Sequence, residues 1–168
     1  MEKLKKIVEN AKNVNSKEEF ENSIKVLEKE ITINPSNNIL KNLFIDLLLS
    51  YGFLLSDEYQ PNYDKAIQIF NRIINLNPKS HRAYYNLGMI YFELKQFKKS
   101  LKFYKKALKL KPDYKYAHYN IGLLFESKNK FKKALKNYEK ALKIDEGFSY
   151  ALEAKKQIQK KIEQNKLK

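Results

Sequence analysis

Few residues in this sequence have side chains suited to metal binding or catalysis. It contains no cysteine and only two histidines, His81 and His118. The lack of cysteine excludes disulfides, thiolate zinc sites, iron–sulfur clusters and cysteine nucleophiles. Two histidines are too few for a histidine metal cluster, and neither stands with a nucleophile and a carboxylate in a recognisable catalytic pattern. The sequence therefore predicts no metal site and no histidine-dependent active site.

Paired carboxylates are another common source of acid–base chemistry, and three acidic pairs occur. They are Glu18-Glu19, Asp57-Glu58 and Asp145-Glu146. Residues adjacent along a helix do not face each other, so we expect these pairs to be solvated surface charges. The four glycines form neither a GxGxxG nor a GxxxxGKS/T motif, which excludes both phosphate-binding loops. The sequence thus predicts no catalytic residue, no cofactor site and no enzyme.

The charge of the chain is large and unevenly distributed. Its 168 residues, about the length of one domain, include 34 Lys and Arg against 19 Asp and Glu, a net charge of +15. Residues 1–80 carry 11 basic and 11 acidic side chains, whereas residues 81–168 carry 23 and 8. A partner attracted by charge alone is therefore expected to meet the C-terminal half.

No segment reads as a secretion signal or a membrane span. Charged residues interrupt the apolar pairs of the N-terminus, so no secretory hydrophobic region forms there. The most apolar stretch, Ile39 to Leu55, is 17 residues long and contains Lys41, Asn42 and Asp46. It is more typical of a buried helix than of a transmembrane segment. We expect a cytoplasmic protein, unless the chain is a piece of a larger one.

A 34-residue repeat organises the C-terminal half. Gly88 and Gly122 lie 34 residues apart, as do Pro78 and Pro112, and residues 81–114 match residues 115–148 in kind. Each unit contains two amphipathic helices, the second beginning at Phe97 or its counterpart Phe131. The apolar positions of these second helices recur every three or four residues, the period of one buried helical face: Leu101, Tyr104 and Leu108, then Ala134, Tyr138 and Ala141. Each unit is therefore predicted to be a helical hairpin.

The repeated glycines have a steric explanation. Two helices packed 8–10 Å apart need small side chains where their axes cross. We expect Gly88 to meet Ser100 and Ala107, and Gly122 to meet Ala134 and Ala141. Close packing offsets the roughly 1 kcal/mol by which glycine weakens a helix relative to alanine.

This pattern resembles the tetratricopeptide repeat. Its signature positions are filled in order in one unit by Tyr84, Leu87, Gly88, Tyr91, Phe97, Ser100, Tyr104, Ala107 and Pro112, and in the next by His118, Ile121, Gly122, Phe125, Phe131, Ala134, Tyr138 and Ala141. Glu146 departs from the family, which usually has proline there. His118 stands where the family has a large core residue and is expected to be a packed or snorkelling side chain rather than a ligand. The resemblance implies an all-α fold in which helical hairpins stack into a right-handed superhelix.

The same resemblance implies a single domain of four hairpins and a C-terminal cap. The repeats fall at about residues 4–37, 38–80, 81–114 and 115–148, and the capping helix at 149–168. The second repeat is nine residues over the period; two of these fit the loop Ser56–Asn62, and seven fit two extra turns at the start of a helix from about Ile39 to Leu55.

Features at the two ends of the chain complete this assignment. Ser16 and Glu19 are predicted to form a capping box at the second helix of the first repeat. Glu30 occupies the position of Ala107, so either that hairpin packs loosely or Glu30 turns to solvent. In the last helix, a narrow apolar stripe is expected to cover the final hairpin; it comprises Ala151, Ala154, Ile158 and Ile162.

In this family, the first helix of each hairpin lines a concave groove. The positions of this sequence that match are apolar, aromatic and amide in character, which suits an extended peptide or the apolar face of a helix. The expected partner-binding residues are Phe53, Arg82, Tyr85, Asn86, Met89, Phe92, Tyr116, Tyr119, Asn120 and Leu123. The sequence therefore predicts a non-enzymatic scaffold or adaptor that binds a segment of a partner protein.

One other binding mode of the family can be examined in the same positions. Family members that hold the acidic tails of heat-shock chaperones use Lys, Arg and Asn at fixed groove positions. In this chain one frame supplies Leu49, Phe53, Asn86, Tyr116 and Asn120, and no other frame supplies the charge clamp, so we expect no recognition of that kind.

The alternative is an electrostatic adaptor whose basic C-terminal half docks on nucleic acid or an anionic membrane surface. The lysines of the second helices predict a basic outer face, which attracts polyanions by charge. Lysine without arginine, however, lacks the planar fork favoured for phosphate and base edges. A solvated face that keeps the protein soluble explains the same lysines.

Overall fold

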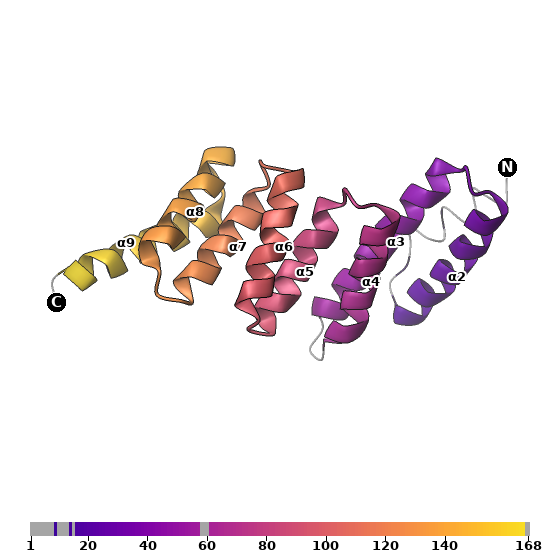
Figure 1. The fold of residues 1–168 in the computed structure, drawn as a ribbon, viewed down its shortest axis with the longest axis horizontal. Helices are drawn as coiled ribbons and strands as arrows, with labels where there is room; N and C mark the ends of the chain where they lie inside the picture. The colour runs from indigo at the N-terminus through magenta and orange to yellow at the C-terminus, as the bar shows by residue number, and fades with distance from the viewer. Residues whose placement is uncertain (1–8, 10–13, 15, 58–60, 167–168) are drawn as a thin grey trace. The chain divides into compact units, whose positions relative to one another are not determined.

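The computed structural model describes residues 9, 14, 16–57 and 61–166. Within these residues it contains eight complete helices and no strand, which confirms the all-α class (Figure 1). The helices are α2 (Lys17–Ile33), α3 (Asn38–Asp57), α4 (Tyr63–Leu76), α5 (His81–Glu93), α6 (Phe97–Leu110), α7 (Lys115–Glu126), α8 (Phe131–Ile144) and α9 (Ser149–Lys166). The first helix expected for the repeat at 4–37 lies outside the described residues.

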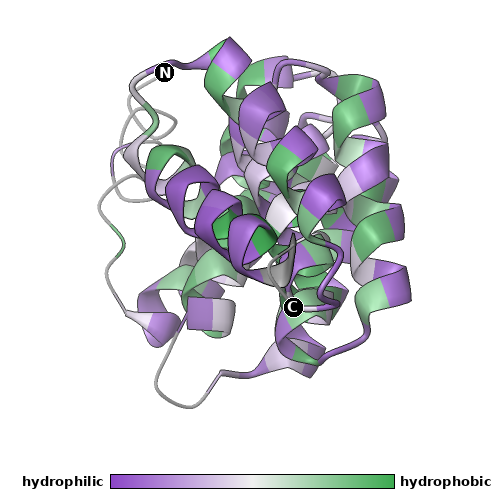
Figure 2. Cartoon of the chain, turned by 90° about the vertical axis from the view of Figure 1, so that its left-hand side faces the viewer, coloured by the Kyte–Doolittle hydropathy of each residue, from purple (hydrophilic) through white to green (hydrophobic). Residues whose placement is uncertain are grey.

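The chain divides into two compact units, Met1–Pro78 and Lys79–Lys168. The first unit contains α2, α3 and α4, and the second contains α5 to α9. Hydrophobic and hydrophilic residues alternate along the helices that face the viewer in Figure 2. Both units contain buried hydrophobic residues. Each unit therefore has an apolar core of its own.

In the first unit, α3 packs against both α2 and α4. It spans 20 residues, close to the long helix predicted from Ile39 to Leu55, and eight of its residues are buried. Of the described helices, α3 alone is long and apolar enough to cross a membrane, although the core helix of a folded domain meets the same criterion.

The N-terminus of α2 has the predicted capping box. The Glu19 backbone N–H donates to Ser16 Oγ at 3.2 Å, and the Ser16 N–H donates to the Glu19 carboxylate at 3.0 Å. The prediction that Glu30 could turn to solvent is wrong, because its exposed fraction is only 9%. Glu30 is on the same helical face as Phe20 and Leu27, which packs toward the core.

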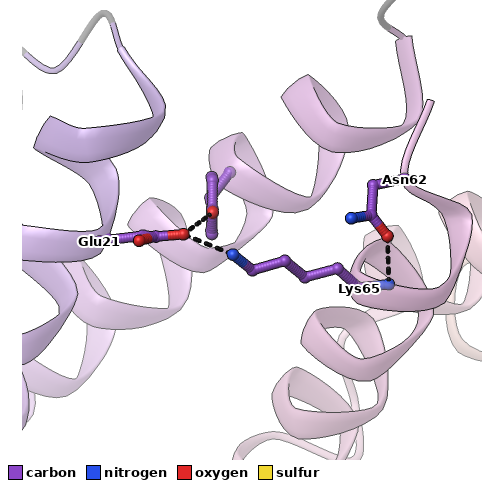
Figure 3. A network of polar contacts seen from close by, with 4 residues as sticks. Glu21, Asn62 and Lys65 are labelled. Carbon is purple, nitrogen blue, oxygen red and sulfur yellow. Dashed lines mark hydrogen bonds and ion pairs between the residues drawn. The ribbon is translucent and has the colours of Figure 1, made fainter. Parts of the chain in front are cut away.

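A polar network joins the three helices that the structure describes in the first unit. Tyr51 on α3 donates a hydrogen bond to Glu21 on α2 at 2.7 Å, and Lys65 on α4 forms an ion pair with the same carboxylate (Figure 3). Asn62 caps α4 by accepting from the Lys65 backbone N–H at 3.0 Å. The hydrogen bond from Lys65, then that from the Tyr51 hydroxyl, and then the charge of Lys65 lower the pKa of Glu21. Sequence periodicity gave no indication of this network.

In the second unit, the helices of each hairpin approach closely at the repeated glycines. A Cβ atom on Gly88 would lie 2.5 Å from the ring of Tyr104, and one on Gly122 would lie 2.3 Å from the ring of Tyr138. Ser100 Oγ donates to the Gly88 carbonyl at 2.8 Å, which confirms the expected meeting of Gly88 and Ser100. The closest neighbours, however, are the tyrosine rings rather than the small residues that the sequence suggested.

The last helix, α9, packs on α8 through its apolar stripe. Ala154 and Ile158 are buried against Ala134 and Tyr138 of α8. Ala151 is also buried and Ile162 is half-buried, so the predicted stripe faces the hairpin.

Candidate functional site

The candidate site is on the first helices of the two regular hairpins, α5 and α7. These helices contact each other directly, and α6 packs against both of them. Between α5 and α7 lies a hollow of about 130 Å³. Its lining, which we call the inner pocket, consists of Met89, Phe92, Glu93, Tyr104, Asn120 and Leu123. Four of these residues were expected at the partner-binding surface, and the structure brings them together.

The helical period explains why these side chains converge. Met89 and Phe92 are three residues apart on α5, and Asn120 and Leu123 are three apart on α7, so each pair shares one face. The neighbouring positions Leu87 and Ile90, and likewise Ile121 and Leu124, are buried in the core. Met89, Phe92 and Leu123 are only half-buried and therefore keep apolar surface toward the pocket.

Tyr85 and Asn120 connect the two helices at the pocket. The Asn120 amide donates from Nδ2 to the Tyr85 hydroxyl at 3.0 Å. The Tyr85 ring packs against Tyr104 at a centroid distance of 5.8 Å and against Tyr114 at 5.1 Å. Burial raises the pKa of Tyr85 far above its usual range, so this hydroxyl stays protonated. Tyr85 therefore supports the pocket wall, and Asn86 beside it is half-buried.

Tyr116 and Tyr119 belong to an aromatic cluster next to the inner pocket. The buried ring of Phe148 lies 5.5 Å from the ring centroids of both tyrosines, at steep interplanar angles. Tyr150, which is 68% exposed, lies 6.2 Å from Tyr119. Sequence reasoning missed Tyr114, Phe148 and Tyr150 as neighbours of the site. The 34-residue spacing of Tyr114 and Phe148 was the available signal.

The two remaining predicted residues are on the surface. Arg82, at the start of α5, is exposed. Phe53 is on α3 in the first unit and is 48% exposed. Glu93 is exposed at the rim of the inner pocket, and Tyr104 is buried at its wall. Neither was predicted at the site, and the sequence pattern assigned Tyr104 to the buried face of its helix.

Comparison with known protein families agrees with this geometry. Models of the tetratricopeptide repeat match residues 54–80, 81–114 and 116–148, which together are more than half of the chain. The chain belongs to the tetratricopeptide repeat family. No curated protein sequence matches it.

Solved tetratricopeptide repeat (TPR) structures share the fold. The chain is similar to the MamA protein, with 25% identity and a TM-score of 0.66 over 90% of this chain and 78% of that one. A TPR protein from Parabacteroides merdae has 21% identity and a TM-score of 0.70, covering 96% of this chain and 60% of its own. The first TPR of Spaghetti (RPAP3), bound to the HSP90 peptide SRMEEVD, has 23% identity and a TM-score of 0.64 over 70% and 92%.

Both histidines of this TPR chain pack against neighbouring residues. His118 Nε2 lies 3.1 Å from the Pro112 carbonyl oxygen, and burial lowers the His118 pKa, as expected for a packed residue. His81 lies edge-on to Tyr114 at 5.0 Å, and burial also lowers its pKa. Within the described ranges, no group of three or more His, Asp or Glu side chains is arranged to hold a metal ion.

One acidic residue of the predicted surface pairs, Asp145, forms an ion pair with a base. Asp145 forms an ion pair with Lys115, whose Nζ lies 4.9 Å from the Phe148 ring centroid. This contact lowers the pKa of Asp145 and raises that of Lys115. Asp145 is therefore a structural partner of the aromatic cluster.

The second helices of the TPR hairpins are rich in lysine, as the sequence shows. All of the lysines on α6 are exposed, and α6 contains no acidic residue. They are Lys98, Lys99, Lys102, Lys105, Lys106 and Lys109. Two of them cover aromatic rings, since Lys99 lies 5.2 Å from the Tyr91 centroid and Lys106 lies 5.2 Å from that of Tyr84.

Proposed function

We propose that the chain is a non-enzymatic interaction module that binds a segment of a partner protein at the inner pocket of α5 and α7. The observation that carries this proposal is the placement of Met89, Phe92 and Leu123. They surround a hollow of about 130 Å³ although the core positions of the same helices are filled by other residues. A binding site typically has apolar side chains that do not belong to the core and that line a concave surface.

The chemistry of the pocket selects the kind of segment. Its apolar wall accommodates one aliphatic or aromatic side chain, and burial of apolar surface contributes roughly 25 cal/mol per Å². The exposed Glu93 carboxylate at the rim favours a basic or neutral residue next to that anchor. We therefore assign the pocket to an apolar anchor residue in a partner peptide or helix.

The similar structures support a peptide-binding role in general. RPAP3 was solved with a bound HSP90 peptide, so this type of scaffold can hold a peptide. The acidic-tail clamp does not extend to this chain, because Tyr116 and Asn120 occupy positions where a clamp would need cations. A segment that ends in an acidic tail is accordingly not the proposed ligand.

Selection from a displayed peptide library tests the proposal. The full chain is used as bait, and the dissociation constants of enriched peptides are measured by titration calorimetry. We expect Phe92→Ala to weaken binding about tenfold or more, as for a central anchor contact, while the outer-face control Lys105→Ala changes it less than twofold. Binding that is equal in Phe92→Ala and in the original chain would contradict the proposal.

A second candidate function has one specific observation in its favour. The six lysines of α6 are exposed without an acidic residue on the same helix, so like charges repel at spacings of three and four residues. A polyanion docked on this face would relieve that repulsion. Charge reversal at Lys102, Lys105 and Lys106 is then expected to abolish binding, and affinity is expected to fall steeply with salt. Binding at the inner pocket instead changes only mildly with salt.

A further inference from the structure

A second and larger cavity lies in the first unit, between the ends of its helices. It has a volume of about 580 Å³. Its walls come from the C-terminal half of α2, the N-terminal half of α3 and the C-terminal end of α4. They consist of Glu28, Ile31, Thr32, Lys41, Phe44, Ile45, Arg72, Asn75 and Leu76. We refer to this site as the α2–α4 cavity.

The α2–α4 cavity arises where the chain departs from the 34-residue period. The start of α3 is 14 residues before Gly52, whereas α5 starts seven residues before Gly88 and α7 seven before Gly122. The seven extra residues of α3 include Lys41 and Phe44, which form part of the wall. The regular hairpins have no equivalent turns, so this cavity is a property of the irregular repeat.

The floor of the cavity is apolar, and the half-exposed charges of Arg72 and Glu28 in its wall pair with each other. The Phe44 ring lies beneath the Arg72 guanidinium, 4.9 Å from its centroid, and Arg72 forms an ion pair with Glu28. The Thr32 hydroxyl donates to the Glu28 backbone carbonyl at 2.9 Å and is likewise occupied. Leu76 remains 53% exposed, so apolar surface is open to a ligand.

Among the charged side chains of the lining, Lys41 is available to pair with a ligand. Lys41 is exposed, and no carboxylate of a described residue forms an ion pair with it. A ligand with an apolar tail and an acidic head group would therefore complement this wall. The apolar floor covers the tail, and the Lys41 ammonium group pairs with the head group.

We propose that the α2–α4 cavity binds a small apolar carboxylate, with its tail against Phe44, Ile45 and Leu76 and its carboxylate at Lys41. A volume of about 580 Å³ falls within the roughly 300–1,000 Å³ of small-molecule sites. The site is independent of the inner pocket, which lies in the other unit.

Amide chemical-shift titration of the full chain tests this assignment with two probes, octanoate and its neutral analogue octanamide. We expect octanoate to shift amides at the ends of α2, α3 and α4 saturably. It is expected to bind about three- to fivefold more tightly than octanamide, the usual gain from one exposed ion pair. Lys41→Gln should lower octanoate affinity to that of octanamide and leave octanamide binding unchanged.

A cavity-filling variant locates the site. Asn75 lines the cavity from an exposed position on α4, so Asn75→Trp is expected to abolish binding of both probes without unfolding the unit. Asn71→Trp, on the same helix but outside the lining, is the matched control and should bind normally. Shifts that do not saturate, that map to α5 and α7, or that persist in Asn75→Trp would overturn the site. Equal affinity for both probes would overturn the carboxylate assignment.

Discussion

The side-chain amide of Asn120 donates a hydrogen bond to the hydroxyl of Tyr85 at 3.0 Å and thereby links the first helices of two successive repeats. Both residues border the inner pocket, Asn120 directly and Tyr85 through its contact with Tyr104. The geometry of the pocket thus depends on a bond between repeats as well as on packing within each hairpin.

Removal of this bond should destabilise the second unit. We expect Asn120→Ala to reduce the free energy of unfolding by about 1 kcal/mol, because the half-buried Tyr85 hydroxyl loses its donor. A double-mutant cycle with Tyr85→Phe, measured by urea denaturation, should show a coupling of about 0.5–1.5 kcal/mol. Asn86→Ala is the control at the same repeat position. Additive effects of the two substitutions would mean that the bond contributes nothing to stability.

The close helix contact at the glycines predicts a second effect on stability. Alanine favours a helix over glycine by about 1 kcal/mol, but a Cβ on Gly88 would lie 2.5 Å from the Tyr104 ring. Such overpacking typically costs about 1–3 kcal/mol, so Gly88→Ala is expected to be destabilising in net terms. In Gly147→Ala the nearest atom is Asp145 Oδ1 at 3.5 Å, and we expect a change within about 0.5 kcal/mol. Thermal unfolding compares the two, and a stabilised Gly88→Ala would contradict the packing described.

These two cases show how far the sequence predicted the structure. The 34-residue period correctly identified the hairpins and the need for a small residue at Gly88. The family resemblance, rather than the period, placed Met89, Phe92 and Leu123 on one surface, and the structure brings them together around one hollow. The period did not identify the Tyr104 ring as the neighbour of Gly88, because that contact depends on how the helices cross. The α2–α4 cavity was not predicted either, since it results from a helix extension that breaks the period.

The polar network of the first unit was also beyond periodicity, because Glu21 and Lys65 are 44 residues apart. The network predicts that the free energy of unfolding depends on pH in the acidic range. The pKa of Glu21 in the folded chain lies below its ordinary value of 4.5, so the folded state binds this proton more weakly than the unfolded state. The stabilisation that ionised Glu21 contributes is therefore present above about pH 4.5, and it is lost as the pH falls through the pKa of Glu21 in the folded chain.

Urea denaturation between pH 3 and pH 7 measures this dependence. Glu21→Gln should flatten the acid side of the profile, while Asp46→Asn, an exposed change on α3, should leave its shape intact. An unchanged slope in Glu21→Gln would show that the network does not couple to folding.

The turns inside the regular hairpins offer a stabilising substitution. Lys95 and Asn129 hold equivalent positions with φ of +57° and +55°, a region that costs most residues about 1–2 kcal/mol. Glycine removes that strain at some cost in chain entropy, so we expect Lys95→Gly to stabilise the unit by about 0.5–1 kcal/mol. Asn129→Gly should gain less, because asparagine tolerates this conformation. Calorimetry measures the melting temperatures of the two variants and shows which substitution stabilises more. A destabilised Lys95→Gly would contradict the assigned turn.

The most direct measurement of the proposed role is the footprint of a bound partner segment on the protein, mapped by amide chemical shifts. A peptide obtained by selection on the full chain is added until saturation. We predict that the largest changes fall on α5 and α7 around Met89, Phe92, Asn120 and Leu123. A footprint confined to the lysine-rich helices α6 and α8 would contradict the account.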